Sequence, residues 1–482
     1  MKSNKFLSIL KKLEPEEIDE FSEFLQQYHK KDKIALRVFQ YVYLFRPTFD
    51  SDKFTIDFIY RKVYKEQLPE TTDEIRRKKV KKLLNKFSEL SHWLEDFLWY
   101  QKISSPSLER DLLFSTILME RKMYRELSQH HSSLKKSLKG SLPGDVPGYL
   151  KQVIASYLMD YQFLESVQGP DPDVLPDFIE HLDSFYAVTR LKLACAMATR
   201  MLIKPEDNNK FEPAFPLSSL MALLPPGHIQ NNPLIAIYAN LFRLITNKSK
   251  KNYEKVEALF KENLNSIAPR EQHDILVLLQ NYTASQIRLG KKRYLEIAHD
   301  LNVFGIEQGC FTRDGNITAT NYTNIINTAC TANALDWAWD FAKECSPRLP
   351  LAIRKNVTKL GEAIILFEKE DYTGVLSTLP GESFSDTHCE IRSRSMYLRS
   401  AWELKKYLSD YDFVLNYCLA FEQYLVNRDK KSKADIVTAS LNFVRIFKKM
   451  ITGHKSKAEL IAEIQSHELL YFRKWLLGKN HV

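Results

Sequence analysis

The chain has 482 residues, of which 44% are hydrophobic and 27% charged, so it can bury a substantial core. Its 14 glycines are few for a β-rich fold with many tight turns, and they argue against glycine-rich phosphate loops. The net charge of +9 is concentrated at the two ends, because residues 1–140 and 427–482 each carry an excess of seven cations. Two basic ends around a mildly acidic middle could attract a polyanion or an acidic protein partner.

The cysteines are widely scattered and form no CxxC pair, which favours a reducing compartment over a disulfide scaffold or a zinc site. The N-terminus has only a five-residue apolar stretch before Lys11, too short for a secretory signal. No run of about 18 apolar residues follows, so no membrane span is expected. These features predict a cytoplasmic protein.

The first 140 residues predict a helical domain. Pro15 suits the first position of a helix, and Ile18, Phe21 and Leu25 then fall on one face. Further helices are expected at about 33–45 and 51–66. Residues 71–74 have the spacing of a capping box and predict the start of a long helix.

The first half of this long helix carries the densest basic cluster of the chain. A phosphate backbone of a nucleic acid is one partner for such a cluster, and a solvated helix face is the alternative. We name it the basic cluster; as a candidate polyanion-binding site it comprises Arg76, Arg77, Lys78, Lys79, Lys81 and Lys82.

The segment from Gly140 to Pro233 is rich in proline and contains 11 of the 19 prolines of the chain. Prolines this dense break helices and fix extended connectors. Helical runs are nevertheless expected at about 148–167, 174–203 and 216–224. Residues 141–235 are therefore interpreted as a proline-interrupted helical middle section.

From Pro233 onward a repeat emerges. An aromatic residue preceded by a polar one recurs at intervals of 41, 43, 35 and 39 residues, and each copy separates two amphipathic segments. The pattern predicts helical hairpins of roughly 35–43 residues, which bury their apolar faces by stacking. The aromatic residues are Tyr253, Tyr294, Trp337, Tyr372 and Tyr411.

At these residues the chain resembles the tetratricopeptide-repeat class of α-solenoids. In that class the turn between helices typically reads Gly-Asp-Tyr-x-x-Ala, and Asp371-Tyr372 followed by Val375 reproduces most of it, as does Asp410-Tyr411. The spacing departs from the 34 residues of that class, and valine replaces alanine. The resemblance covers about residues 236–426 and implies a superhelix of stacked hairpins. The N-terminal part resembles an uncharacterised bacterial helical family, to which no activity is attached.

Local motifs for chemistry are missing: the sequence has no Walker P-loop, GxGxxG, HExxH, GxSxG or EF-hand pattern. The adjacent pairs His130-His131 and His388-Cys389 suit joint metal binding poorly, because neighbouring side chains on a helix point about 100° apart. No catalytic, cofactor or metal residue is therefore predicted, although a site assembled from distant residues stays open.

A second basic patch lies on an expected repeat helix. Its side chains could line a groove and hold an acidic peptide, and the candidate residues are Arg392, Arg394 and Arg399, followed by Lys405 and Lys406.

The sequence therefore predicts an all-α fold: a helical domain over 1–140, the middle section over 141–235 and a tetratricopeptide-like repeat domain over 236–482. The expected function is that of a non-catalytic scaffold or adaptor that binds another protein through the helical-repeat surface. The alternative is a nucleic-acid-associated or regulatory helical protein that uses its basic ends.

Overall fold

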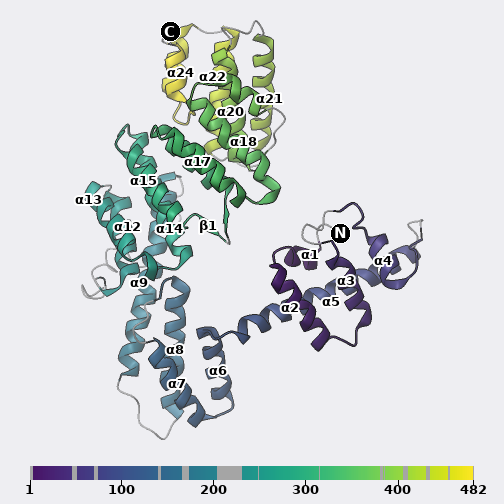
Figure 1. The fold of residues 1–482 in the computed structure, drawn as a ribbon. Helices are drawn as coiled ribbons and strands as arrows, with labels where there is room; N and C mark the ends of the chain where they lie inside the picture. Colours follow the sequence, from purple (N-terminus) through teal and green to yellow (C-terminus); the bar gives the residue numbers. More distant parts are fainter. Residues whose placement is uncertain are drawn as a thin grey trace. The chain divides into compact units, whose positions relative to one another are not determined.

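The computed structural model describes most of the chain, namely residues 4–45, 51–69, 74–138, 143–165, 173–203, 229, 231–247, 249–313, 315–379, 384, 386–404, 411–429, 435–453 and 456–480. Nearly all of these residues lie in helices (Figure 1). The strands of the described part form one short antiparallel hairpin, β1 (Thr312–Arg313) with β2 (Asn316–Ile317). The expected all-α helical-repeat fold is confirmed.

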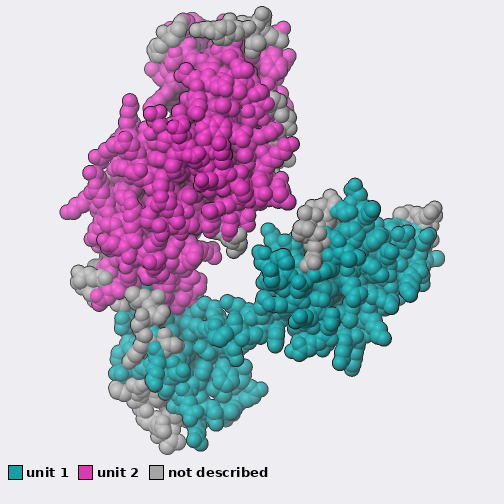
Figure 2. Space-filling model, viewed as in Figure 1, with its two compact units in different colours: residues 1–141, 149–183 teal, residues 142–148, 184–482 magenta. Residues whose placement is uncertain are grey.

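The residues group into two compact units (Figure 2). Unit 1 comprises residues 1–141 and 149–183, and unit 2 comprises residues 142–148 and 184–482. The domain boundaries at 140 and 235, which were expected from the distribution of prolines, are not tested by this division and stay a prediction.

Unit 1 is built from consecutive helices, but the first three residues of α8 and the second part of α9 belong to unit 2. The helices are α1 (Lys5–Leu10), α2 (Pro15–Tyr28), α3 (Lys33–Tyr43), α4 (Ile56–Tyr64), α5 (Glu74–Ser104), α6 (Leu108–Glu120), α7 (Tyr124–Leu138), α8 (Val146–Glu165) and α9 (Val174–Ile203).

The first five helices enclose an aromatic core. Phe21 of α2 lies at its centre, with ring centroids 5.3 Å from Phe39 and 5.5 Å from Phe97. The long helix α5 lines this core with Leu83, Phe87 and the apolar residues that follow at helical spacing. Residues 71–73, expected to cap α5, lie outside the described part.

Unit 2 continues as a series of helical hairpins. Its remaining elements are α12 (Pro233–Asn247), α13 (Lys250–Glu262), η2 (Leu264–Ser266), α14 (Pro269–Arg288), α15 (Tyr294–Glu307), α16 (Ala319–Thr331), α17 (Leu335–Cys345), η3 (Ser346–Arg348), α18 (Leu351–Glu368), α19 (Tyr372–Thr378), α20 (Thr387–Leu404), α21 (Tyr411–Asp429), α22 (Asp435–Thr452), α23 (Lys457–Ser466) and α24 (Arg473–Asn480).

The repeating aromatic residues lie in the first turn of the second helix of each hairpin, as predicted. Tyr294, Tyr372 and Tyr411 open α15, α19 and α21, and Tyr253 and Trp337 follow within the first four residues of α13 and α17. Tyr253 and Tyr294 are fully buried, whereas Tyr372 is half-buried against the ring of Phe367 at 5.5 Å.

Asp371 explains the Asp-Tyr pair of the repeat. Its side chain accepts a hydrogen bond from the backbone N–H of Gly374 at 2.9 Å and so caps α19. A Cβ at position 374 would lie 2.5 Å from an Asp371 carboxylate oxygen, so any other residue there would displace the capping side chain. Asp410 of the other good copy lies outside the described residues.

The same turn closes several hairpins. After the first helix one residue adopts the left-handed conformation, and the N–H that follows it bonds back to a carbonyl five residues earlier. This arrangement satisfies carbonyls that the helix end leaves without partners. The left-handed residues are Lys122, Gly290, Asn333 and Glu370.

Candidate functional site

Helices α16, α18 and α20 form a row in unit 2, which we call the α16–α18–α20 row. They run in the same direction, because their first turns line one pocket and, further along, Gly361 lies against Ile326 and Arg392 reaches Asn324. α16 contributes a polar, uncharged stripe of exposed residues at helical spacing. These residues are Thr320, Asn324, Asn327 and Thr331.

Arg392 of α20 is a charged residue that links two helices of the row. One guanidinium nitrogen, Nη2, donates to Oδ1 of Asn324 at 2.9 Å. The other, Nη1, is buried, and no described group accepts a hydrogen bond from it. Burial lowers the pKa of Arg392, since the charged form loses hydration. A buried guanidinium N–H without an acceptor is costly, and such sites suit an anionic ligand.

A pocket of about 440 Å³ opens between the first turns of the three helices of the row. Cys389, one helical turn before Arg392, lines it together with Asn356 and Asp386. Burial raises the pKa of the Cys389 thiol to about 12, so the group stays protonated at neutral pH and is a poor nucleophile. The other lining residues are Ala319, Ala352, Ile353, Val357 and Phe384.

Arg399 shares the helix face of Arg392 but is already occupied. Its guanidinium lies between two rings, 4.4 Å from the centroid of Phe367 and 3.9 Å from that of Phe472. Burial lowers its pKa to about 10, while Glu368 and Glu403 favour the charged form. This arginine therefore holds the protein's own C-terminal segment.

Arg394 points elsewhere. It forms an ion pair with Glu390 at 2.5 Å and lies 4.8 Å from the ring of Tyr424 on α21. The structure thus places Arg392 and Arg399 on one face of α20 and Arg394 on another, while Lys405 and Lys406 lie outside the described residues. Sequence reasoning missed Asn324, although the spacing of the polar residues on α16 was a signal that could have found it.

The basic cluster on α5 is largely paired with nearby carboxylates. Arg76 bonds to Asp57 at 2.8 Å, Lys78 to Glu74 at 2.7 Å and Lys79 to Glu66 at 3.0 Å. Lys82 lies 4.9 Å from the ring of Tyr64. Within the described residues, Arg77 and Lys81 form no ion pair, and both are exposed one turn apart.

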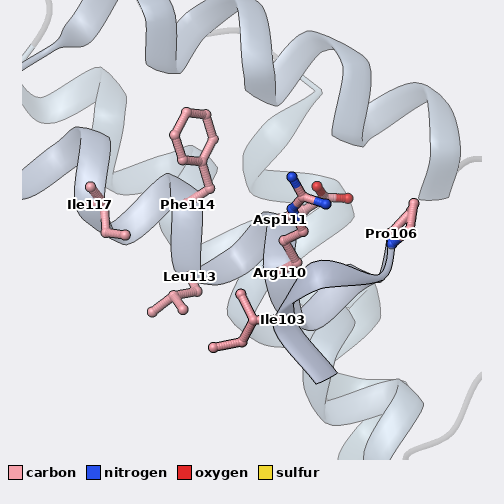
Figure 3. A pocket seen from close by; sticks show the side chains of 7 residues that line it. All are labelled: Ile103, Pro106, Arg110, Asp111, Leu113, Phe114 and Ile117. Carbon is pink, nitrogen blue, oxygen red and sulfur yellow. The ribbon is translucent and has the colours of Figure 1, made fainter. Parts of the chain in front are cut away.

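Unit 1 has a pocket of about 370 Å³ at the junction of α5 and α6 (Figure 3). Ile103 of α5 and Leu113, Phe114 and Ile117 of α6 give it an apolar lining, and Pro106, Arg110 and Asp111 complete it. Arg110 Nη1 donates to the carbonyl of Ser104 at 3.1 Å. The charged residues of the lining are one cation, Arg110, and one carboxylate, Asp111, so the pocket has no excess of positive or negative charge.

Within the described ranges, no group of three or more His, Cys, Asp or Glu side chains is placed to hold a metal ion. No helix in that part of the chain is both long and apolar enough to cross a membrane. The sequence matches no protein-family model, no curated protein and no solved structure.

Proposed function

We propose that the chain is a non-catalytic interaction scaffold whose α16–α18–α20 row binds an acidic segment of another protein. The observation that carries this proposal is Arg392 Nη1, a buried donor without an acceptor on a row of helices that also offers an exposed amide, Asn324. The pocket beside Cys389, one helical turn from Arg392, would take an acidic side chain of the partner, and the positive charge of Arg392 would favour it there.

The stacked helical hairpins of unit 2 support this proposal. The Asp371 cap and the left-handed turn residues fix how the two helices of a hairpin meet, so successive first helices line up side by side. Stacked hairpins of this kind present an extended surface built from the first helix of each repeat. Arg392 and Asn324 lie on first helices.

The proposal is tested by capturing partners on the full chain and on two variants. Arg392→Gln removes the charge, and Arg445→Gln, at an exposed arginine of α22 in the same unit, is the matched control. A specific protein should be retained by the unchanged chain and by the control, released by glutamate-rich peptide, and lost with Arg392→Gln. Identical capture by all three proteins would contradict the proposal.

A stability measurement separates a binding role from a packing role. Since Arg392 is desolvated with an unsatisfied nitrogen, its neutral replacement should leave the free energy of unfolding unchanged or raise it. Lost binding without lost stability would assign Arg392 to the partner, whereas a strongly destabilised variant would assign it to the fold.

A further inference from the structure

Helix α8 and the first part of α9 pack as an antiparallel pair in unit 1 (Figure 1). Ser156 Oγ lies 2.7 Å from Nδ1 of His181, and the rings of Tyr157 and Phe178 lie 6.3 Å apart. Residue numbers on α9 fall as those on α8 rise, which gives the direction of the pair. These contacts mark the side of each helix that faces the other.

Each of the two helices carries an exposed apolar stripe at spacings i, i+4 and i+7. The six side chains keep between 40% and 57% of their surface exposed, which is unusual for so many large apolar residues on two neighbouring helices. They are Leu150, Ile154 and Tyr157 on α8 and Leu175, Ile179 and Leu182 on α9.

The two stripes lie on the same side of the pair. With 100° per residue, each stripe is centred about a quarter turn from the residues that contact the other helix. Because the helices are antiparallel, a quarter turn in the same sense on each helix places both stripes on one common face of the pair. On this face Ile154 lies opposite Leu182, and Tyr157 lies opposite Ile179. We call it the α8–α9 face. Seven residues along each helix span about 10 Å, two helical turns.

The charges beside this face have one sign. Asp183 lies at the outer edge of the α9 stripe and Glu180 nearly one turn before it, and residues 174–189 contain no lysine or arginine. Within the described residues, Glu180 and Asp183 form no ion pair, and both are exposed. Lys151 of α8 is neutralised by Glu109 of α6. The outer edge of the apolar face is therefore acidic.

We propose that the α8–α9 face binds an amphipathic helix of another protein that carries lysine or arginine beside its apolar stripe. Apolar residues at i, i+4 and i+7 of that helix would pack against the two stripes, and cations beside them would lie near Glu180 and Asp183. A second copy of the chain fits less well, since a two-fold interface would bring two identical acidic edges together. This site is in unit 1 and does not depend on the proposed role of Arg392.

The test uses two helical probe peptides of the same pattern, each of about 18 residues, with leucines at i, i+4 and i+7. One carries lysine at its polar positions and the other glutamate. Binding to the full chain is followed by fluorescence anisotropy at low and at physiological ionic strength. The lysine peptide should bind at least about tenfold more tightly than the glutamate peptide, and added salt should weaken it.

Variants locate the site. Ile179→Asn and Ile154→Asn should each weaken binding of the lysine peptide about tenfold, the usual worth of one buried aliphatic side chain. Asp183→Lys should weaken it severalfold and flatten its salt dependence. The matched controls, Leu289→Asn at a leucine with 68% exposure and Glu262→Lys at an exposed acid, both in unit 2, should leave binding unchanged.

Three results would overturn the proposal. The first is equal binding of both peptides, or of neither; the second is binding that neither isoleucine variant weakens. The third is a dimer of the chain, seen by sedimentation, that Ile179→Asn dissociates, because the face would then belong to a second copy. Both isoleucines are substantially exposed, so circular dichroism of the variants should match that of the unchanged chain.

Discussion

Gly361 of α18 lies directly against the ring of Tyr322 of α16. A Cβ at position 361 would fall 2.8 Å from Tyr322 Cε1 and 2.8 Å from Ile326 Cδ1. Both neighbours are fully buried, and Tyr322 is held by a hydrogen bond from its hydroxyl to the carbonyl of Ala342. The close approach of these two helices therefore depends on the missing side chain.

Gly361→Ala should destabilise the protein by about 1–3 kcal/mol, because the added methyl group overpacks a rigid contact. Chemical denaturation followed by circular dichroism measures the change. Gly478→Ala in α24 is the control: no atom lies within 4 Å of its Cβ position, so alanine should be neutral or stabilise by about 0.5–1 kcal/mol. Equal effects at both positions would refute the close contact.

Glu370→Gly should stabilise the protein by roughly 0.5–1 kcal/mol. Glu370 has a φ of 60° in the turn before α19, and the left-handed region is unfavourable for residues with a Cβ. Glycine removes this strain but makes the unfolded chain more flexible, so the net gain is modest. Glu362→Gly, inside α18, should instead cost about 1 kcal/mol. Comparing the two denaturation midpoints checks the sign.

Arg399→Ala should cost roughly 2–4 kcal/mol of stability. The change removes the cation between Phe367 and Phe472 and leaves Glu368, whose pKa burial already raises, without its neighbouring positive charge. Arg399→Lys, which keeps the charge but not the planar stacking, should lose less. If alanine and lysine were equally harmful, stacking alone would account for the effect of Arg399.

Stability should fall as the pH is lowered below about 6.5. Burial lowers the pKa of His181, so between its folded and unfolded pKa values the unfolded chain binds more protons than the folded one. The stabilising contribution of the neutral ring is thus complete above the unfolded value and is lost as the pH falls toward the folded one. His181→Gln should reduce this pH dependence in thermal unfolding, and an unchanged pH dependence in this variant would contradict the prediction.

The hairpins could be predicted from the sequence because apolar periodicity and the aromatic spacing report local helix formation directly. The turn conformation could not, since the left-handed position is occupied by lysine, glycine, asparagine and glutamate in turn. Only Gly290 and Asn333 carry a residue type that signals it.

The candidate site was only partly predictable, for a similar reason. The sequence grouped Arg394 with Arg392 and Arg399, although Arg394 lies on another side of α20. A sequence alone does not show which side of a helix faces its neighbours. Asn324 lies 68 positions before Arg392. Only the stacking of α16 beside α20 brings the two together.

The six cysteines have a practical consequence. All are buried and free, all belong to unit 2, and burial raises the pKa of each thiol, to about 12 for Cys195, Cys330, Cys389 and Cys418. A maleimide can therefore react only when the helices around a given thiol open. Because these thiols are spread from α9 to α21, the labelling rate of each cysteine would report how often the helices around it open. Unit 2 could thus be followed segment by segment without an engineered probe, whereas unit 1 has no cysteine to label.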